Sequence, residues 1–184
     1  MQAPGGPTED TSGGFRYGGW TVPYWDDFLN NVMATQMAKP FDLLLGRKTY
    51  DIFAGYWPNS KEQGADKLNS TKKYVVSTTL TNPEWKNSVV ISDDVVKQIL
   101  ELKQEAGPEL QVHGSSNLIQ TLLQFDLVDE LRLKIFPLTL GLGKHLFGDG
   151  SMPASFKLTE CKASPKGVIV ANYVRAGEVK TGSF

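Results

Sequence analysis

Cysteine and histidine are scarce in this sequence, which contains one cysteine and two histidines in 184 residues. Cys161 has no partner for an internal disulfide, so a reducing compartment is favoured and we expect a cytoplasmic protein. Its strand-like surroundings predict a buried side chain that acts as a small hydrophobic residue. One cysteine and two histidines, His113 and His145, are too few ligands for a dedicated zinc site, so no metal is predicted.

An excess of charge and a long apolar run are also missing. The 19 basic and 20 acidic residues give a formal net charge of -1, whereas nucleic-acid-binding domains usually have a basic excess. No apolar stretch approaches the roughly 20 residues of a membrane-spanning helix. The polar start lacks the apolar segment of a signal peptide. We therefore expect neither nucleic acid nor a membrane among the partners.

The length and composition are typical of one folded domain, and we expect a single domain over residues 1–184. Residues 1–21 are rich in glycine, proline, threonine and serine, which predicts an irregular loop. That loop is either a disordered leader or, because Phe15, Tyr17 and Trp20 lie within it, a packed segment.

Strands and helices alternate along the middle of the chain. Hydrophobic spacing predicts strands at residues 41–45, 73–77, 89–92 and 110–112. Helices are predicted at residues 23–38, 47–53, 93–106 and 116–125, and a loop at 55–64. Such alternation implies a parallel sheet with helices on its faces. Three more strands are predicted at residues 129–136, 156–161 and 168–175, the last two as an antiparallel hairpin.

One predicted strand ends in Gly46, Arg47, Lys48 and Thr49, where a helix begins. In open α/β sheets, ligands bind beyond the carboxyl ends of the strands. Two cations at the positive end of a helix oppose the usual preference for acids, and a bound anion would resolve this conflict. The alternative is that both cations are solvated, with Asp51 as a partner.

Two other predicted strands end in hydroxyl groups. Gly114 and Ser115 begin a loop whose backbone can approach a ligand closely, unless the serine only caps the next helix. Ser77, Thr78 and Thr79 either hold a ribose phosphate or form an ordinary polar turn. Three neighbouring phosphate-suited ends predict one dinucleotide, and Arg47 suits the 2′-phosphate that distinguishes NADPH from NADH.

Four longer stretches resemble a known family. They are residues 43–58, 112–123, 128–137 and 140–147. In sequence and order they resemble the reductase domain of riboflavin biosynthesis, which is the C-terminal domain of a bifunctional deaminase-reductase, and its stand-alone relatives. The resemblance implies a dihydrofolate reductase-like α/β fold with three layers (α/β/α). Its mixed, mostly parallel sheet ends in a C-terminal antiparallel hairpin.

The resemblance also implies NADPH as the cofactor and a homodimer. The positions that match its cofactor loops are Gly46, Arg47, Lys48, Thr49, Ser77, Thr78, Gly114, Ser115, Ser116, Asn117 and Leu118. Relatives begin with a strand and an acidic turn before the segment that matches residues 1–6, so we expect that strand to be absent here. The pathway enzyme commonly carries a zinc-binding deaminase domain, and the scarcity of histidine and cysteine therefore predicts a stand-alone member.

The predicted reaction transfers a hydride from NADPH to a C=N or C=O carbon. The substrate is expected to be a small pterin- or pyrimidine-like heterocycle, or a related carbonyl or imine compound. Asp26 and Asp27 are the candidate proton donors, unless they only favour the dipole of their helix. Tyr56 and Trp57 are candidates for contact with the substrate ring. The alternative function is a non-catalytic NADP-binding protein of the same fold.

Overall fold

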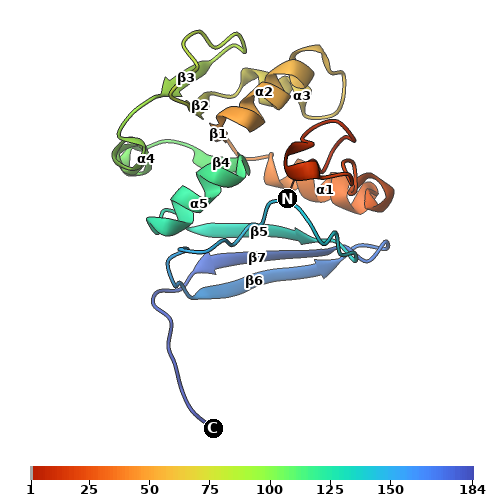
Figure 1. Cartoon of the computed structure of the whole chain (residues 1–184), viewed down its shortest axis with the longest axis vertical. Helices are drawn as coiled ribbons and strands as arrows, with labels where there is room; N and C mark the ends of the chain where they lie inside the picture. The colour runs from red at the N-terminus through yellow and green to blue at the C-terminus, as the bar shows by residue number, and fades with distance from the viewer. Residues whose placement is uncertain (1) are drawn as a thin grey trace. The chain divides into compact units, whose positions relative to one another are not determined.

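The computed structural model describes residues 2–184, which form two compact units. One unit is Met33–Thr121, and the other joins Leu122–Phe184 to the residues before Met33. Each unit contains one β-sheet, whose strands lie side by side in Figure 1. The predicted α/β fold class is confirmed, because parallel strands come first along the chain and an antiparallel hairpin follows.

Within Met33–Thr121, four parallel strands form a sheet in the order β3-β2-β1-β4. Their bounds are β1 Phe41–Gly46, β2 Lys73–Val76, β3 Ser88–Ile91 and β4 Glu109–Gly114. The register places Gly46 of β1 beside Val76 of β2, and Leu45 of β1 beside Gly114 of β4. The three strand ends that were predicted to bind phosphate therefore lie along one edge of this sheet.

Helices follow the strands of this unit. The helical segments between strands are α2 (Arg47–Tyr56), the 3-10 helix η3 (Trp57–Asn59), α3 (Ala65–Ser70) and α4 (Val95–Gln104). Two further helices, α1 (Asp27–Gln36) and α5 (Ser116–Gln124), each contain residues of both units. Among residues 2–184, no helix has the length and apolar character needed to cross a bilayer.

The hydrophobic core of Met33–Thr121 is built on alternating residues of the central strands. Leu43 and Leu45 of β1 and Val75 of β2 are fully buried, and the pairing of Leu45 with Val75 puts them on one face. Tyr50 of α2 and Leu68 of α3 pack in the same cluster. Each buried leucine or valine contributes roughly 1.5–3 kcal/mol, so this face holds the sheet and its helices together.

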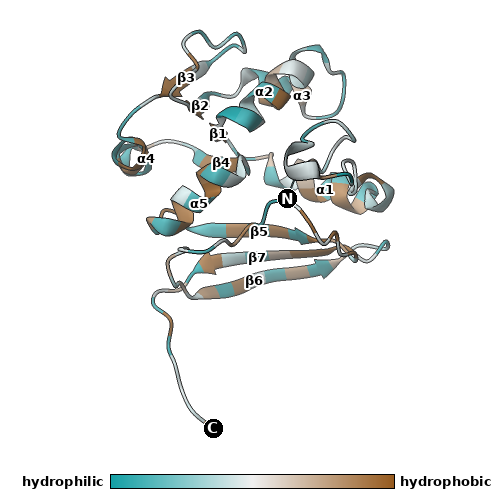
Figure 2. Ribbon diagram, in the orientation of Figure 1, coloured by the Kyte–Doolittle hydropathy of each residue, from teal (hydrophilic) through white to brown (hydrophobic). Residues whose placement is uncertain are grey.

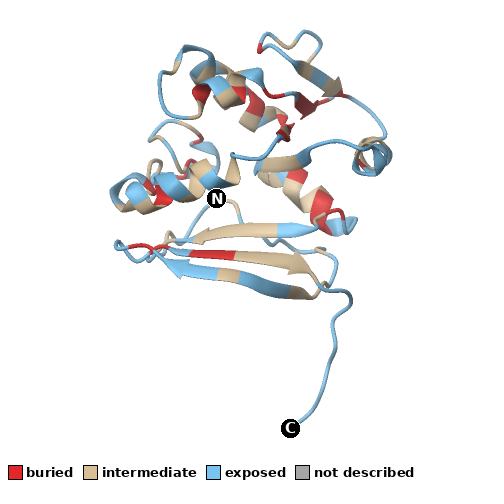
Figure 3. Ribbon diagram, turned by 180° about the vertical axis from the view of Figure 1, so that it is seen from behind, coloured by how far each residue is buried: buried red, intermediate tan, exposed pale blue. Residues whose placement is uncertain are grey.

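The other unit contains a three-stranded antiparallel sheet in the order β5-β7-β6. Its strands are β5 Glu130–Ile135, β6 Phe156–Ala163 and β7 Ile169–Arg175. β7 is buried near its start, at Val170 and Ala171, whereas β6 is mostly exposed (Figure 3). Polar and apolar residues alternate along β6 (Figure 2). Leu29 of α1 packs against Val168 and Val170, which forms the core of this unit.

The residues before α1 form a packed loop. Residues 2–26 contain two 3-10 helices, η1 (Ser12–Gly14) and η2 (Val22–Tyr24), and no strand. Phe15 is buried, and the indole N–H of Trp20 donates to the backbone oxygen of Gln2 over 2.9 Å. The aromatic residues thus anchor this segment, as the packed-loop alternative requires.

Two local expectations fail near the end of α2. The predicted loop at residues 55–64 is wrong at its start, because α2 continues to Tyr56 and η3 begins at Trp57. Trp57 packs against the core and lies edge-on to Phe53, with 6.1 Å between ring centres. That packing keeps the chain helical. The helix α3 was not predicted, since its six residues are too few for a hydrophobic period.

The expected burial of Cys161 is also wrong, because its side chain is exposed. Cys161 lies on β6, which is an edge strand of its sheet and pairs only with β7 among residues 2–184. A strand-like sequence predicts the backbone conformation but not which side chains of an edge strand are covered.

Lys73, the first residue of β2, is a fully buried cation. Its Nζ donates to the backbone oxygens of Asn69 over 2.8 Å and Lys86 over 3.1 Å, and lies 4.2 Å from the ring centre of Trp85. These partners carry no formal negative charge. Burial therefore lowers the pKa of Lys73 from 10.5 to about 8.

We expect the free energy of unfolding to rise between about pH 8 and pH 10.5, since the unfolded chain then holds a proton that folded Lys73 has released. Between pH 7 and pH 9.5 the gain is roughly 2 kcal/mol, measured by urea unfolding. Lys73→Met should abolish this rise. Lys72→Met is the matched control and should keep it, because Lys72 is exposed and its pKa is raised by Tyr74. An equal rise in the parent and Lys73→Met would contradict the assignment.

Candidate functional site

The carboxyl edge of the parallel sheet brings the predicted cofactor residues together. The loops after β1, β2 and β4 are neighbours there, because β1 pairs with both β2 and β4. α2 begins at this edge with Arg47, and α5 begins with Ser116. No side chain caps the start of α2. The N–H groups of its first turn are therefore left for water or for an anion.

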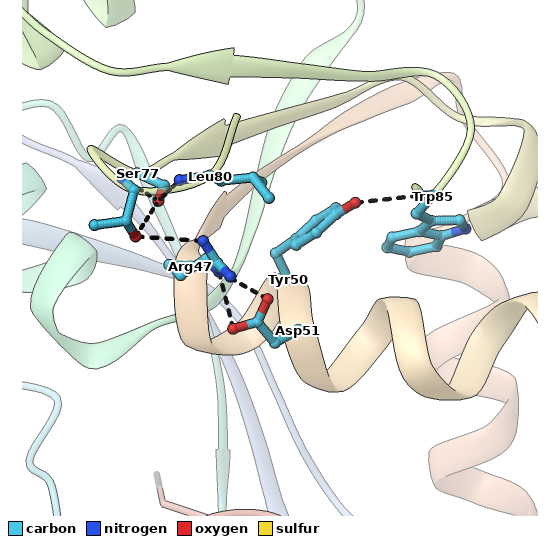
Figure 4. A network of polar contacts seen from close by, with 7 residues as sticks. Arg47, Tyr50, Asp51, Ser77, Leu80 and Trp85 are labelled. Atoms are coloured by element: carbon cyan, nitrogen blue, oxygen red, sulfur yellow. Dashed lines mark hydrogen bonds and ion pairs between the residues drawn. The ribbon is translucent and has the colours of Figure 1, made fainter. Parts of the chain in front are cut away.

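Arg47 connects two of these loops, as Figure 4 shows. Its Nε donates to both carboxylate oxygens of Asp51, over 2.8 and 2.9 Å, and its Nη1 donates to Oγ1 of Thr79 over 3.3 Å. The side chain is 41% exposed, so its other N–H groups can reach a ligand. The pairing with Asp51 that the sequence left as an alternative is present, and it leaves room for an anion.

Ser77 and the residues after it form a tight turn. The hydroxyl oxygen of Ser77 accepts the backbone N–H groups of Thr79 over 3.2 Å and Leu80 over 3.1 Å, and Ser77 is buried. Thr78 and Thr79 are exposed. Ser77 therefore shapes the turn, while Thr79, the last of the three hydroxyl residues predicted at this strand end, contacts Arg47.

The loops after β1 and β4 approach each other closely. A Cβ atom on Gly46 would lie 2.0 Å from Oγ of Ser115, and one on Gly114 would lie 2.5 Å from Oγ1 of Thr49. Gly114 also has a φ of 143°, and the peptide bond from Gly114 to Ser115 is cis. Both positions therefore need glycine, and the hydroxyls of Ser115 and Thr49 are held in this contact.

The remaining cofactor positions differ in exposure. Lys48 and Asn117 are exposed and Ser116 is half-buried, whereas the side chain of Leu118 is buried. The edge therefore offers a guanidinium, an ammonium, hydroxyls, an amide and free main-chain N–H groups. This donor set fits the phosphates of a dinucleotide such as NADPH.

Asp26 and Asp27 belong to the unit that contains the antiparallel sheet. Oδ1 of Asp26 accepts the backbone N–H of Leu29 over 3.0 Å, which caps α1. Oδ2 of Asp26 is buried and accepts no hydrogen bond from residues 2–184. Asp27 is exposed in the first turn of α1. These contacts support the helix-start alternative, and proton donation by either residue stays a prediction.

Tyr56 and Trp57 differ in their availability to a substrate. Tyr56 is 49% exposed, and its hydroxyl hydrogen-bonds Oε1 of Glu62. Trp57 is half-buried, and its backbone oxygen accepts the side-chain amide of Asn69 over 3.0 Å. Only Tyr56 of this pair is open to a ligand, and the substrate role of both stays a prediction.

Known proteins resemble this chain in sequence and in fold. Residues 1–170 match the RibD C-terminal domain family. The uncharacterized protein YyaP of Bacillus subtilis (strain 168) is 32% identical over 152 residues, which cover 80% of this chain and 76% of YyaP. The resemblance predicted from the sequence is thereby confirmed.

Two solved structures have a similar fold. A putative riboflavin biosynthesis protein from Shewanella sp. PV-4 has a TM-score of 0.64 and 24% identity, over 83% of this chain and 81% of that chain. A pyrimidine reductase-like protein from Corynebacterium diphtheriae has a TM-score of 0.58 and 15% identity, over 85% of this chain and 84% of that chain. At these identities the two structures support the fold alone.

We expect Gly46→Ala to lower the free energy of unfolding by roughly 1–3 kcal/mol, because the new Cβ meets Ser115. Adding Ser115→Gly should recover only part of the loss, since the backbone N of residue 115 stays 3.0 Å from that Cβ. Thermal unfolding measures both variants.

Gly55→Ala, in the helix α2 that follows Gly46, is the matched control. Gly55 is exposed, and a Cβ there meets nothing within 4 Å. This variant should gain up to about 1 kcal/mol from helix propensity. If Gly46→Ala behaved like Gly55→Ala, the close approach of the two loops would be refuted.

Proposed function

The chain belongs to the RibD C-terminal domain family, and from this premise we propose that it is an NADPH-dependent reductase. The proposed substrate is a small pterin- or pyrimidine-like heterocycle, or a related carbonyl or imine compound. The observation that carries the proposal is that the loops after β1, β2 and β4 are neighbours, with Arg47 hydrogen-bonded to Thr79 and Gly46 close to Ser115.

Arg47 is the residue proposed to bind the 2′-phosphate. Asp51 holds Nε and so fixes the plane of the guanidinium, while Nη1 lies beside the hydroxyl of Thr79. The planar guanidinium matches phosphate oxygens in geometry, and the threonine hydroxyl is a further donor. NADH lacks this phosphate, so Arg47 would set the preference for NADPH.

The pyrophosphate is assigned to the loops that start α2 and α5. The uncapped N–H groups at the start of α2 and the hydroxyls of Ser115 and Ser116 are suitable donors. Gly114 brings the second loop close without a side chain in the way. Bound NADPH supplies the hydride, and the protein residues at this edge bind and orient the cofactor.

A non-catalytic NADP-binding protein is the second candidate function. The position of Asp26 favours this non-catalytic function, because one of its carboxylate oxygens caps α1 and the other is buried. Asp26 is therefore poorly placed to donate a proton to a ligand. Both candidate functions use the same cofactor loops and differ only in turnover.

Arg47→Ala should weaken NADPH binding by about 10- to 100-fold, since a charged hydrogen bond contributes roughly 1.5–3 kcal/mol. NADH affinity should change less than about threefold, because NADH has no 2′-phosphate for the lost guanidinium. Fluorescence titration of each nucleotide measures this. Lys61→Ala removes an exposed cation beyond the other end of α2 and should leave both affinities unchanged. Equal losses for NADPH and NADH would contradict the role of Arg47.

Turnover separates the two candidate functions. With a panel of pterins, pyrimidines and aldehydes, a reductase should oxidise NADPH only when both protein and substrate are present, as a fall in cofactor absorbance. Arg47→Ala should then raise KM for NADPH by a factor similar to its loss of affinity. Tight NADPH binding with no turnover across the panel would favour the non-catalytic function, and absence of NADPH binding would overturn both.

A further inference from the structure

The antiparallel sheet has one face without charged residues, which we call the outer face. Side chains alternate between the two faces of a sheet, so residues that lie opposite one another across the strands share a face. The register of β5, β7 and β6 forms three such rows, which are Leu131, Tyr173 and Leu158; Leu133, Ala171 and Cys161; and Ile135, Ile169 and Ala163. These nine residues make up the outer face.

The charged residues of the same strands lie on the opposite face. Arg132 and Lys134 alternate with the apolar residues of β5, and Lys162 of β6 lies opposite Val170. Val170 packs with Leu29 in the core of this unit. In an antiparallel sheet, the face away from the core usually meets water and is polar. Here that face is apolar, which is typical of a surface that a partner covers.

Much of the outer face is open to solvent. Its exposed members are Ile135 (50%), Leu158 (48%), Ile169 (41%), Cys161 and Ala163. Ala171 is buried, because it is small and lies between larger neighbours in the central row. The exposed residues are contiguous across β5, β7 and β6, so they form a patch and are not scattered single side chains.

A pocket of about 210 Å³ continues this apolar surface at the start of β6. Phe156 lines the pocket and lies two residues before Leu158 on the same strand, and therefore on the same face. Phe147 and Met152 also line the pocket, and each is more than half exposed. The apolar surface thus extends beyond the sheet, with room for a side chain from a partner.

The free edge of β6 is less suited to a partner than the outer face. Among residues 2–184, β6 pairs only with β7. The strand carries Lys157, Glu160 and Lys162, and its register is irregular between Leu158 and Glu160. Charges and bulges are the features that prevent pairing between sheet edges. A partner is therefore expected on the face and not along the edge.

A second copy of this chain is the partner that the outer face fits. Because the face is neutral, two copies can stack without bringing like charges together, and a two-fold axis places the same rows against each other. Three strands of six residues cover roughly 300 Å², from a strand spacing of about 4.8 Å and a rise of about 3.4 Å. A stable interface buries roughly 800 Å² per partner, so an association through this face is weak and reversible.

We propose that two copies of this chain associate through their outer faces, stacked sheet on sheet. The contact covers Ile135, Leu158 and Ile169, which are exposed in the single copy. The inference does not rest on the proposed function, because the cofactor loops belong to Met33–Thr121 and the outer face belongs to the other unit.

Sedimentation equilibrium of the whole chain, from about 5 to about 500 µM, measures the association. The mass should rise from one copy towards two. Ile169→Lys should weaken association at least about tenfold, because the two-fold axis brings an ammonium group from each copy out of water. Leu158→Lys should do the same, and it is a second variant in case the first does not fold.

Val89→Lys is the matched control. Val89 is 45% exposed on β3, in the other sheet, so this variant makes the same change of charge away from the outer face. Its association should equal that of the parent. A chain that stays single over the whole range overturns the proposal, and so does equal weakening in Val89→Lys and Ile169→Lys.

The thiol of Cys161 gives a second measurement. Cys161 is the one cysteine of the chain and lies on the outer face, where it is exposed in the single copy. Its rate of reaction with a charged thiol reagent should fall as the protein concentration rises, and in Ile169→Lys the rate should fall less. A rate that is independent of concentration while the mass doubles would place the contact elsewhere and overturn the proposal.

Discussion

The close approach of the loops after β1 and β4 is the constraint on which the candidate cofactor site depends. Gly46 and Gly114 leave no room for a Cβ, since Ser115 and Thr49 occupy that space. Because the loops touch, donors separated by about seventy residues in sequence share one edge of the sheet. The phosphate-binding hypothesis needs this proximity more than it needs any single cation, since main-chain N–H groups act only over short distances.

Two cations, Arg47 and Lys73, lie at opposite edges of the parallel sheet and have different roles. At the carboxyl edge, the side chain of Arg47 is partly exposed and paired with Asp51, and its remaining N–H groups can still donate to a ligand. At the opposite edge, Lys73 is fully buried among neutral carbonyl oxygens, and burial depresses its pKa to about 8. The first arrangement suits recognition of an anion. The second joins α3 to the sheet, and its buried charge opposes folding below about pH 8.

Much of the fold was predictable because the parallel strands carry strong local signals. The apolar run before Gly46 has the length of a buried strand, and the cations after it mark a helix start that lacks acids. Once the fold class follows from strand and helix order, the edge that holds the loops follows too. The three strand ends and Arg47 already indicated NADPH as the cofactor, and the resemblance to a known family implied the same cofactor.

What escaped prediction depends on contacts between distant residues. Three hydroxyl residues were predicted after β2, but not which of them meets Arg47. Thr79 does so across 32 positions of sequence, because the hydroxyl of Ser77 accepts backbone N–H groups and orders the turn. Trp57 is helical because it packs on the core, and Cys161 is exposed because β6 is an edge strand. Local sequence patterns do not contain the partner of a side chain, so they could not distinguish these outcomes.

A reductase must also deliver a proton, and the carboxylates placed by this fold limit where that proton originates. Asp51 is bound bidentately to Arg47, and Asp26 caps α1. Asp10, which forms a 2.6 Å ion pair with Lys144, has a pKa of about 2 and carries no proton at neutral pH. Asp10 therefore orients Lys144 and does not act as the acid.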